Sequence, residues 1–410
     1  MTTRISTVKA LLEAHGRPER EVYYDLENSP RVPEEVVKAM LPYFNVKGYG
    51  HPSITHRPGW EAVEIVESTR EAVAGTINAE PENITFTPSG TAANNLALVG
   101  SCMETGKGKI VISAVEHESV IFPAIRTLGS LGYRVVQAPV DEDGLVDPEI
   151  LASLVDKSTV LVSVQLVNHE IGTIQKVREI AEYAKDVNSR VLVHTDAADG
   201  WGWIPIDVER LGVDLLTLSG RKIQAPRGVG ILWVRDGVKM RRIVEGPLST
   251  QSLWPGVENT PIIAGLREAI KLAFEDMEGR AGRVAGLRDR LMEGILGQLD
   301  DVILNGPRGA MRSPDNLNIS FLHVEGEALT IELSTKGIYV SSGSACTSRV
   351  LEPSHVMLAI GRKYEEAHGS ILFKLTKYHT MEDVKYTIEN VLSAVERLRK
   401  ISAIRGGLVE

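Results

Sequence analysis

Short apolar runs alternate with stretches of helical periodicity along the first two-thirds of the chain. Most runs are rich in Val, Ile or Leu, and polar or glycine-containing residues follow them. Continuous apolar strands that alternate with helices indicate an α/β fold, with a mostly parallel central sheet covered by helices on both faces. The expected strands are residues 83–87, 109–113, 134–138, 159–165, 190–194, 214–218 and 228–234. The helices expected between them include residues 63–77, 95–103, 148–155 and 177–187.

The pattern changes in the last third of the chain. Residues 280–299 predict a long amphipathic helix, and residues 316–321 predict a short strand. Thr380, followed by Glu382 and Asp383, is a typical N-cap and first turn for a final helix. We therefore expect a second, smaller α+β domain.

Composition narrows the class of protein. The 410 residues carry a net charge of −9, which argues against a nucleic-acid partner. The two cysteines, Cys102 and Cys346, are too few for a disulfide framework or a cysteine-rich zinc site. No long apolar run and no signal-peptide pattern occur, so we expect a cytoplasmic protein without a membrane partner.

Polar residues follow five of the expected strands, at the sheet edge where open α/β folds bind ligands. One such segment, Pro88 to Thr91, is a small-residue turn before a helix; it suits a phosphate but matches neither common nucleotide motif. Each segment alone is more typical of capping and turns. Together, a phosphate turn, a carboxylate and a lysine are what pyridoxal 5'-phosphate (PLP) requires. The other four segments are Glu116-His117, Asn168 to Gly172, Asp196 and Ser219 to Lys222.

Cys346 lies in a segment of Ser, Gly, Ala and Thr, where reactive thiols are commonly placed. Cys102 instead has the pattern of a small apolar residue inside a helix. His169-Glu170 lacks the second histidine of a zinc-binding helix. No second histidine follows His117 at a spacing that would let both bind one metal ion, so we expect no metal site.

These segments, in this order, resemble the cysteine desulfurases, which are class-V aminotransferase-like PLP enzymes of fold type I. The resemblance runs from Tyr24-Asp25 to the final helix and is most specific at Ser341–Ser348 with Leu351–Val356. It implies a homodimer, a large PLP-binding domain (residues 23–262) and a small domain with the cysteine loop (263–410). Residues 1–22 are then expected to pack on the small domain.

The resemblance also implies roles for individual residues. Lys222 holds PLP through a Schiff base and moves the Cα proton, Asp196 pairs with the ring nitrogen, and His117 stacks on the ring and assists proton transfer. Cys346 attacks the sulfur of L-cysteine, leaving alanine and a persulfide. The remaining cofactor-binding positions are Gly90, Thr91, Asn168, His169, Asp199, Ser219 and Arg221.

Some positions depart from the family pattern. Arg221 replaces a phosphate-binding histidine, while His169 and Asp199 replace an asparagine and a glutamine that meet the ring hydroxyl. Residues 254–257 (Trp-Pro-Gly-Val) replace an arginine and a threonine of the partner-subunit loop. Leu372 stands where an arginine usually clamps the substrate carboxylate, a contact that contributes about 1.5–3 kcal/mol.

Three functions stay open on the sequence. The first is a cysteine desulfurase that passes sulfur to an iron–sulfur scaffold or a sulfur-carrier protein, for cluster assembly or RNA thiolation. The second is a selenocysteine lyase or another PLP-dependent lyase, which Leu372 favours. The third is a non-catalytic persulfide carrier or cluster-assembly partner, with Cys346 as a transient iron–sulfur ligand; the presence of Lys222 and Asp196 argues against it.

Overall fold

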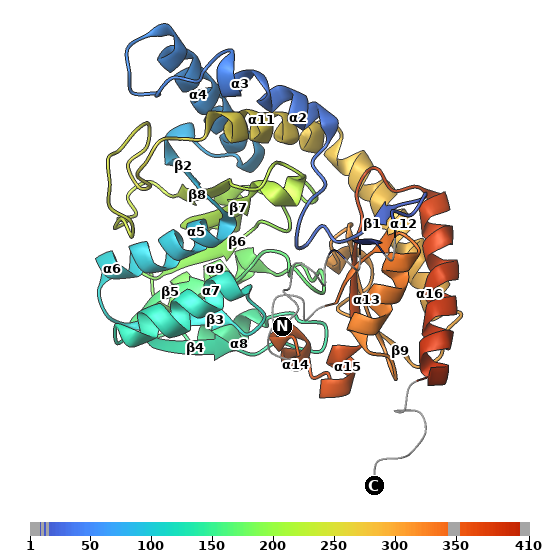
Figure 1. The fold of residues 1–410 in the computed structure, drawn as a ribbon. Coiled ribbons are helices and arrows are strands. Elements are labelled where there is room, and N and C mark those ends of the chain that lie inside the picture. Colours follow the sequence, from blue (N-terminus) through green and yellow to red (C-terminus); the bar gives the residue numbers. More distant parts are fainter. Residues whose placement is uncertain (1–8, 10–11, 14–15, 343–352, 402–410) are drawn as a thin grey trace, which may run out of the picture. The chain divides into compact units, whose positions relative to one another are not determined.

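The computed structural model describes residues 9, 12–13, 16–342 and 353–401 (Figure 1). The chain forms two compact units. The larger unit contains residues 29–281 and 306–313, and the smaller unit contains the described residues within 1–28, 282–305 and 314–410.

The larger unit is built on a seven-stranded sheet in the order β2-β8-β7-β6-β5-β3-β4 (Figure 1). The pairs from β7 through β4 are parallel, whereas β8 is antiparallel to both β7 and β2. The predicted mostly parallel sheet is therefore confirmed. Its strands are β2 (Ile84–Thr87), β3 (Lys109–Ser113), β4 (Arg134–Ala138), β5 (Thr159–Ser163), β6 (Leu192–Asp196), β7 (Leu215–Ser219) and β8 (Gly230–Val234).

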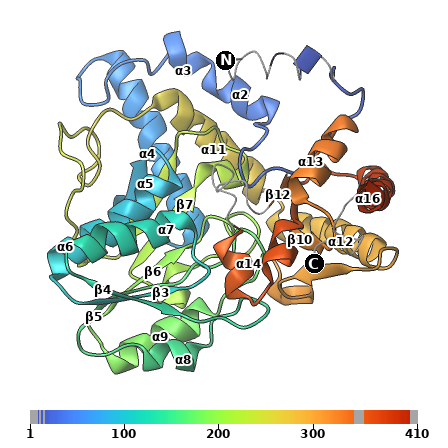
Figure 2. The same ribbon diagram turned by 60° about the horizontal axis from the view of Figure 1, so that its bottom comes forward.

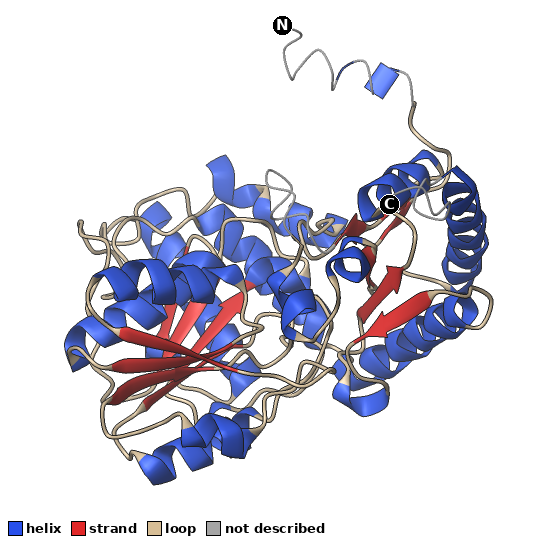
Figure 3. Cartoon of the chain, turned by 90° about the horizontal axis from the view of Figure 1, so that it is seen from below, coloured by secondary structure: helices blue, strands red, loops and turns tan. Residues whose placement is uncertain are grey.

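Helices cover both faces of this sheet (Figure 3). Alternate strand residues supply two apolar clusters: Val111 belongs to one, while its neighbours Ile110 and Ile112 belong to the other. Helices α4 (Arg57–Ile77), α8 (Pro148–Ser153), α9 (Val177–Val187) and α11 (Thr260–Phe274) contribute to the first cluster. Helices α5 (Gly90–Asn95), α6 (Ser101–Thr105) and α7 (Glu118–Phe122), with the π-helical turns η2 (Leu96–Gly100) and η3 (Pro123–Leu128), contribute to the second.

Shorter helices complete the larger unit. They are α2 (Glu34–Met40), α3 (Pro42–Asn45), α10 (Val208–Leu211) and the 3-10 turns η1 (Pro81–Asn83), η4 (Gly220–Ile223) and η5 (Gly309–Met311).

Two strands end later than the sequence pattern predicts. The expected ends were 194 and 218, but β6 extends to Asp196 and β7 to Ser219. Both polar residues still occupy paired positions, Asp196 opposite Thr217 and Ser219 opposite Gly230. These two side chains therefore stand on the strand ends themselves, which are more rigid supports than loops.

The smaller unit contains an antiparallel sheet in the order β12 (Ser341–Ser342), β13 (Ser370–Lys374), β10 (Asn316–Phe321) and β9 (Val302–Asn305). Helix α12 (Met277–Leu296), which belongs to this unit from residue 282 on, lies close to α16 (Met381–Ile401) (Figure 2). Gly294 permits this approach, because a Cβ there would lie 2.3 Å from Cδ1 of Ile388. The remaining helices are α13 (Gly326–Thr335), α14 (His355–Ala359) and α15 (Tyr364–His368).

The start of α16 confirms the predicted cap. The Asp383 N–H donates to Thr380 Oγ1 at 3.2 Å, and the Thr380 N–H donates to Asp383 Oδ2 at 3.0 Å. Near the N-terminus, β1 (Val22–Tyr23) pairs in parallel with β11 (Ile338–Tyr339), and Arg20 donates to Asp383 at 2.9 Å.

The two units divide the chain elsewhere than at residue 262. Helix α11 belongs to the larger unit, where Ile263, Leu266 and Ile270 join the apolar cluster that includes residues of α4. The buried face of α11 completes the core of the larger unit. This helix therefore belongs to that unit, although most of its residues follow the boundary expected at residue 262.

Candidate active site

The turn after β2 lies against the ends of two other strands of the same sheet. Ser89 caps α5, since its Oγ accepts a hydrogen bond from the Ala92 N–H at 3.1 Å. A Cβ on Gly90 would lie 3.1 Å from Cβ of Ser219, and a Cβ on Gly230 would lie 2.1 Å from the Ser89 carbonyl carbon. Glycine at both positions therefore leaves room for the close approach. The first N–H groups of α5, which include those of Gly90 and exposed Thr91, lack helical acceptors and are suited to an anion.

Asp196, at the end of β6, is held by two donors from the same unit. Its Oδ2 accepts from Asn94 Nδ2 at 2.7 Å, and its Oδ1 accepts from the Ala198 N–H at 3.0 Å. Burial raises the pKa of Asp196, while these hydrogen bonds act in the opposite direction. The same Asn94 amide donates to Ser119 Oγ at 2.8 Å. Asn94 has no sequence signal for this role, because nothing in its local pattern distinguishes it from an ordinary polar residue of a helix.

Lys222 and Asp199 form a buried ion pair. Lys222 Nζ donates to Asp199 Oδ1 at 2.8 Å, and the two side chains are only 6% and 8% exposed. Both residues interact electrostatically with Asp196, whose pKa Asp199 raises and Lys222 lowers. The structure therefore brings together Lys222 and Asp196, which the sequence places at two different strand ends, and Asp199, which the family resemblance singles out.

Two histidines meet beside them. His117 caps α7, with Nδ1 accepting from the Ser119 N–H at 3.0 Å. Its ring lies edge-on to that of His169, with centroids 4.9 Å apart and planes at 71°. His169 Nε2 is 3.5 Å from Glu170 Oε1, and both side chains are buried.

Asn168 and Glu116 support this turn from within. Asn168 Oδ1 accepts from the N–H groups of Glu170 and Ile171, and its Nδ2 donates to the Val115 carbonyl at 3.0 Å. Glu116 accepts from the Gln165 N–H at 2.8 Å, and burial raises the pKa of Glu116 well above its ordinary value. The segment that carries His169 is thus fixed by buried polar contacts.

The remaining predicted positions differ in what can be described. Ser219 is buried at the end of β7, and Arg221 lies half-buried in η4 beside Lys222. Cys346 lies outside the described residues. Leu372 is 2% exposed in β13, opposite Asn318 and Ser341. Cys102 is buried in α6, and burial raises its pKa to about 12, as suits a core residue.

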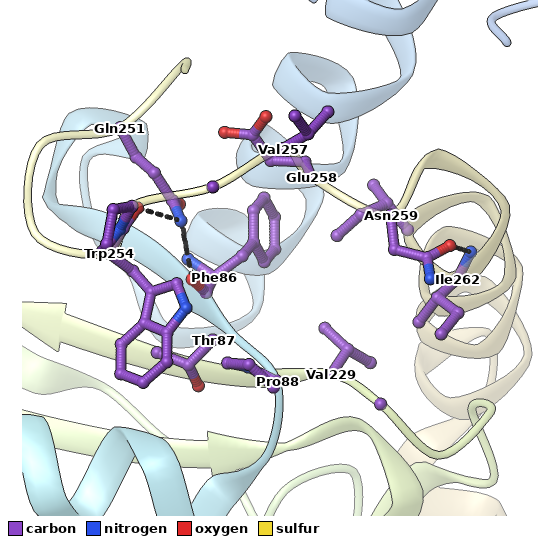
Figure 4. A pocket seen from close by; sticks show the side chains of 14 residues that line it. Phe86, Thr87, Pro88, Val229, Gln251, Trp254, Val257, Glu258, Asn259 and Ile262 are labelled. Atoms are coloured by element: carbon purple, nitrogen blue, oxygen red, sulfur yellow. Dashed lines mark hydrogen bonds between the residues drawn. The ribbon is translucent and has the colours of Figure 1, made fainter. Parts of the chain in front are cut away.

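A cavity of about 250 Å³ lies in the larger unit between the end of β2 and residues 251–263 (Figure 4). Phe86, Val229, Trp254 and Ile262 give it an apolar lining. The Gln251 side chain crosses its edge: its Oε1 accepts from the Phe86 N–H at 2.9 Å, and its Nε2 donates to the Phe86 carbonyl at 2.7 Å.

Within the described part of the chain, every helix is too short or too polar to span a membrane, and no group of three His, Cys, Asp or Glu side chains is placed to hold a metal ion.

Comparisons with known proteins agree with the motifs. Residues 22–387 match the family model for class-V aminotransferases. The chain is 42% identical to cysteine desulfurase IscS 1 of Archaeoglobus fulgidus over 384 residues, or 93% of this chain and 99% of that protein. It is 41% identical to cysteine desulfurase IscS of Dictyoglomus turgidum over 93% of this chain and 96% of that protein. The solved structure of a NifS-like protein superposes with a TM-score of 0.85 at 33% identity, covering 92% of this chain and 100% of that one.

Proposed function

Because the chain belongs to the class-V aminotransferases and to their cysteine desulfurase branch, whose members use PLP, we propose that it converts L-cysteine to L-alanine and takes the sulfur as a persulfide on Cys346. The observation that carries the proposal is the convergence of Lys222, Asp199 and Asp196 at one edge of the sheet. A protein that only carried sulfur would need neither a buried lysine nor the carboxylates beside it.

The residues around this edge fit the cofactor. Asp196, held by Asn94 and Ala198, offers its carboxylate to a ring nitrogen and keeps it protonated. The close-packed turn at Gly90 gives Thr91, Ser219 and Arg221 a common place to bind a phosphate. His117, capping α7 beside His169, presents its ring for stacking. When bound, PLP supplies an electron sink for the Cα carbanion.

Lys222 and Cys346 carry out the remaining chemistry, and His117 assists the proton transfer. Lys222 anchors the cofactor and then carries the Cα proton. The Cys346 thiolate forms a bond with the substrate sulfur as the sulfur–carbon bond breaks. The electron pair of the broken bond stays with the substrate, which takes up a proton and leaves as alanine.

Leu372 supports a second candidate, a lyase that acts on selenocysteine or another amino acid. Its buried apolar side chain cannot pair with a substrate carboxylate. The proposed enzyme therefore holds that carboxylate by other groups or accepts a different substrate.

The partners we propose are a second copy of the chain and a protein acceptor for the persulfide, either an iron–sulfur scaffold or a sulfur carrier. We place the enzyme in the cytoplasm. Exposed apolar side chains are concentrated in residues 41–60 and 248–257 of the larger unit, as a dimer interface requires. They are Leu41, Phe44, Val46, Tyr49, Ile54, Trp60, Leu248 and Val257.

The test is an assay of the PLP-loaded protein with L-cysteine and a reductant. We expect equal amounts of alanine and sulfide. Cys346→Ser should keep the visible cofactor band but lose sulfide release, whereas Cys102→Ala should keep both and serves as the matched control. Lys222→Ala should lose the band. Sulfide release by Cys346→Ser at the wild-type rate would overturn the role of this thiol.

A further inference from the structure

We propose that Asp199 sets the charge of the Lys222 nitrogen, slowing its reaction with the cofactor aldehyde and keeping a proton on the nitrogen once the two are joined. Asp199 is then a positioning residue that acts through Lys222. The inference rests on the proposed function, which assigns the cofactor to Lys222.

Lys222 and Asp199 are in direct contact and buried together. Lys222 Nζ and Asp199 Oδ1 are 2.8 Å apart, and neither side chain is more than 8% exposed. Asp199 lies in the turn after β6 and Lys222 in η4 after β7, so two adjacent parallel strands fix the contact. A buried charge without a partner is costly, and this pairing favours the ionised form of both groups.

Asp196, the other carboxylate at this edge, does not take the place of Asp199 as the hydrogen-bond partner of Lys222. Asp196 is occupied by Asn94 and the Ala198 N–H, at 2.7 and 3.0 Å. Both Lys222 and Asp199 act on it electrostatically, and His117 and His169 follow neighbouring strands at the same edge. The two carboxylates thus have separate tasks: one is held by neutral donors, and the other faces the ammonium.

The chemistry of attachment makes the charge matter. Only the neutral amine can attack an aldehyde carbon, so the ammonium must first give up a proton to a base. The nitrogen then forms a C=N bond, and the carbonyl oxygen leaves as water. The new nitrogen is positive when protonated, so a carboxylate at 2.8 Å from the amine opposes the first step and stabilises the protonated product.

The experiment replaces the carboxylate by a neutral side chain of the same size, Asp199→Asn. Protein stripped of PLP is mixed with PLP, and growth of the visible band is followed over a range of pH. The band of the loaded protein is then titrated. We expect uptake about tenfold faster at neutral pH and a titration midpoint lower by about one pH unit or more. A purely structural role would not move the midpoint in this direction.

Two further variants make the result decisive. Asp199→Gln should behave like Asp199→Asn and decides the matter if the asparagine variant does not fold. Asp214→Asn removes a buried carboxylate from another ion pair, with the partly exposed Lys185 at 2.9 Å, at the opposite end of β7, and should match the wild type.

The experiment distinguishes a failure of the Asp199 role from a failure of the proposed function. If the wild type forms a Lys222-dependent band and both Asp199 variants match it in rate and midpoint, the role of Asp199 is overturned and the proposed function stands. If the wild type takes up no PLP, both are overturned.

Discussion

At the scale of single residues, Leu372 places an uncharged side chain in a row of polar neighbours on β10, β12 and β13. Asn318 and Ser341 stand opposite it, and Ser370 and Lys374 lie two positions away on the same face of β13. Lys374 is already engaged, since its Nζ lies 3.0 Å from Glu27 Oε2. Position 372 itself therefore offers no positive charge to an anionic ligand.

Leu372→Arg should restore a charge-assisted pair and lower KM for L-cysteine about ten- to a hundredfold. Steady-state kinetics on the PLP-loaded protein measures the change. Leu372→Met, similar in volume to leucine and uncharged, should leave KM near the wild-type value. An unchanged or higher KM in the arginine variant, with its circular dichroism intact, would contradict the argument.

Single residues also mark the limit of what the sequence predicts. Lys222, Asp196 and His117 could be selected because each follows a strongly apolar strand. Asn94 could not, since its importance depends on Asp196 and Ser119, which are far from it in sequence. The sequence shows that Asp199 departs from the family pattern, but its ion pair with Lys222 is visible only in the structure.

At the scale of elements, His194 links three neighbouring strands. From β6, its Nδ1 lies 2.8 Å from Ser163 Oγ on β5, and its Nε2 lies 3.1 Å from Thr217 Oγ1 on β7. Burial lowers the pKa of His194 to about 3. Between about pH 3 and pH 6.5, the folded protein therefore keeps this imidazole neutral, whereas the unfolded chain would protonate it.

The free energy of unfolding should fall as the pH falls from about 6.5 towards 3, because the unfolded state binds a proton that the folded state does not. This group contributes a slope of up to about 1.4 kcal/mol per pH unit. Denaturant unfolding at several pH values should show a shallower slope for His194→Gln. The exposed-site variant His51→Gln should retain the full slope, and equal slopes for both variants would refute the role of His194.

Helices and strands with a clear apolar pattern could be predicted from the sequence, whereas some strands of the smaller unit could not. Strands β3, β4 and β10 and helix α9 occur at the predicted residues, because their apolar pattern alone determines them. Strands β9 and β13 were not predicted. β13 carries Ser370 and Lys374 at its ends, and a strand with buried polar residues has no clear sequence signal. The smaller unit was consequently expected only in outline.

At the scale of the whole molecule, the chain carries a net charge of −9 and yet exposes a concentrated set of apolar side chains in the larger unit. Phe44 and Trp60 are each 61% exposed in the single chain. Such side chains indicate an interface when they occur together.

We expect the protein to be a dimer in solution and Trp60→Glu to be a monomer, because the variant would bury a charge in the interface. Light scattering coupled to gel filtration measures the mass. Ile331→Glu, at a 59% exposed position in the smaller unit, is the control and should remain a dimer. A monomeric wild type, or a dimeric Trp60→Glu, would disprove the interface.

The contact between Gln251 and Phe86 occupies backbone groups at an edge of the larger sheet. β2 is an outermost strand, and its backbone would ordinarily offer hydrogen bonds to any extended chain. The Gln251 amide occupies the Phe86 N–H and carbonyl as a strand residue would. These backbone groups of Phe86 are therefore already engaged and do not offer a pairing site to an added strand.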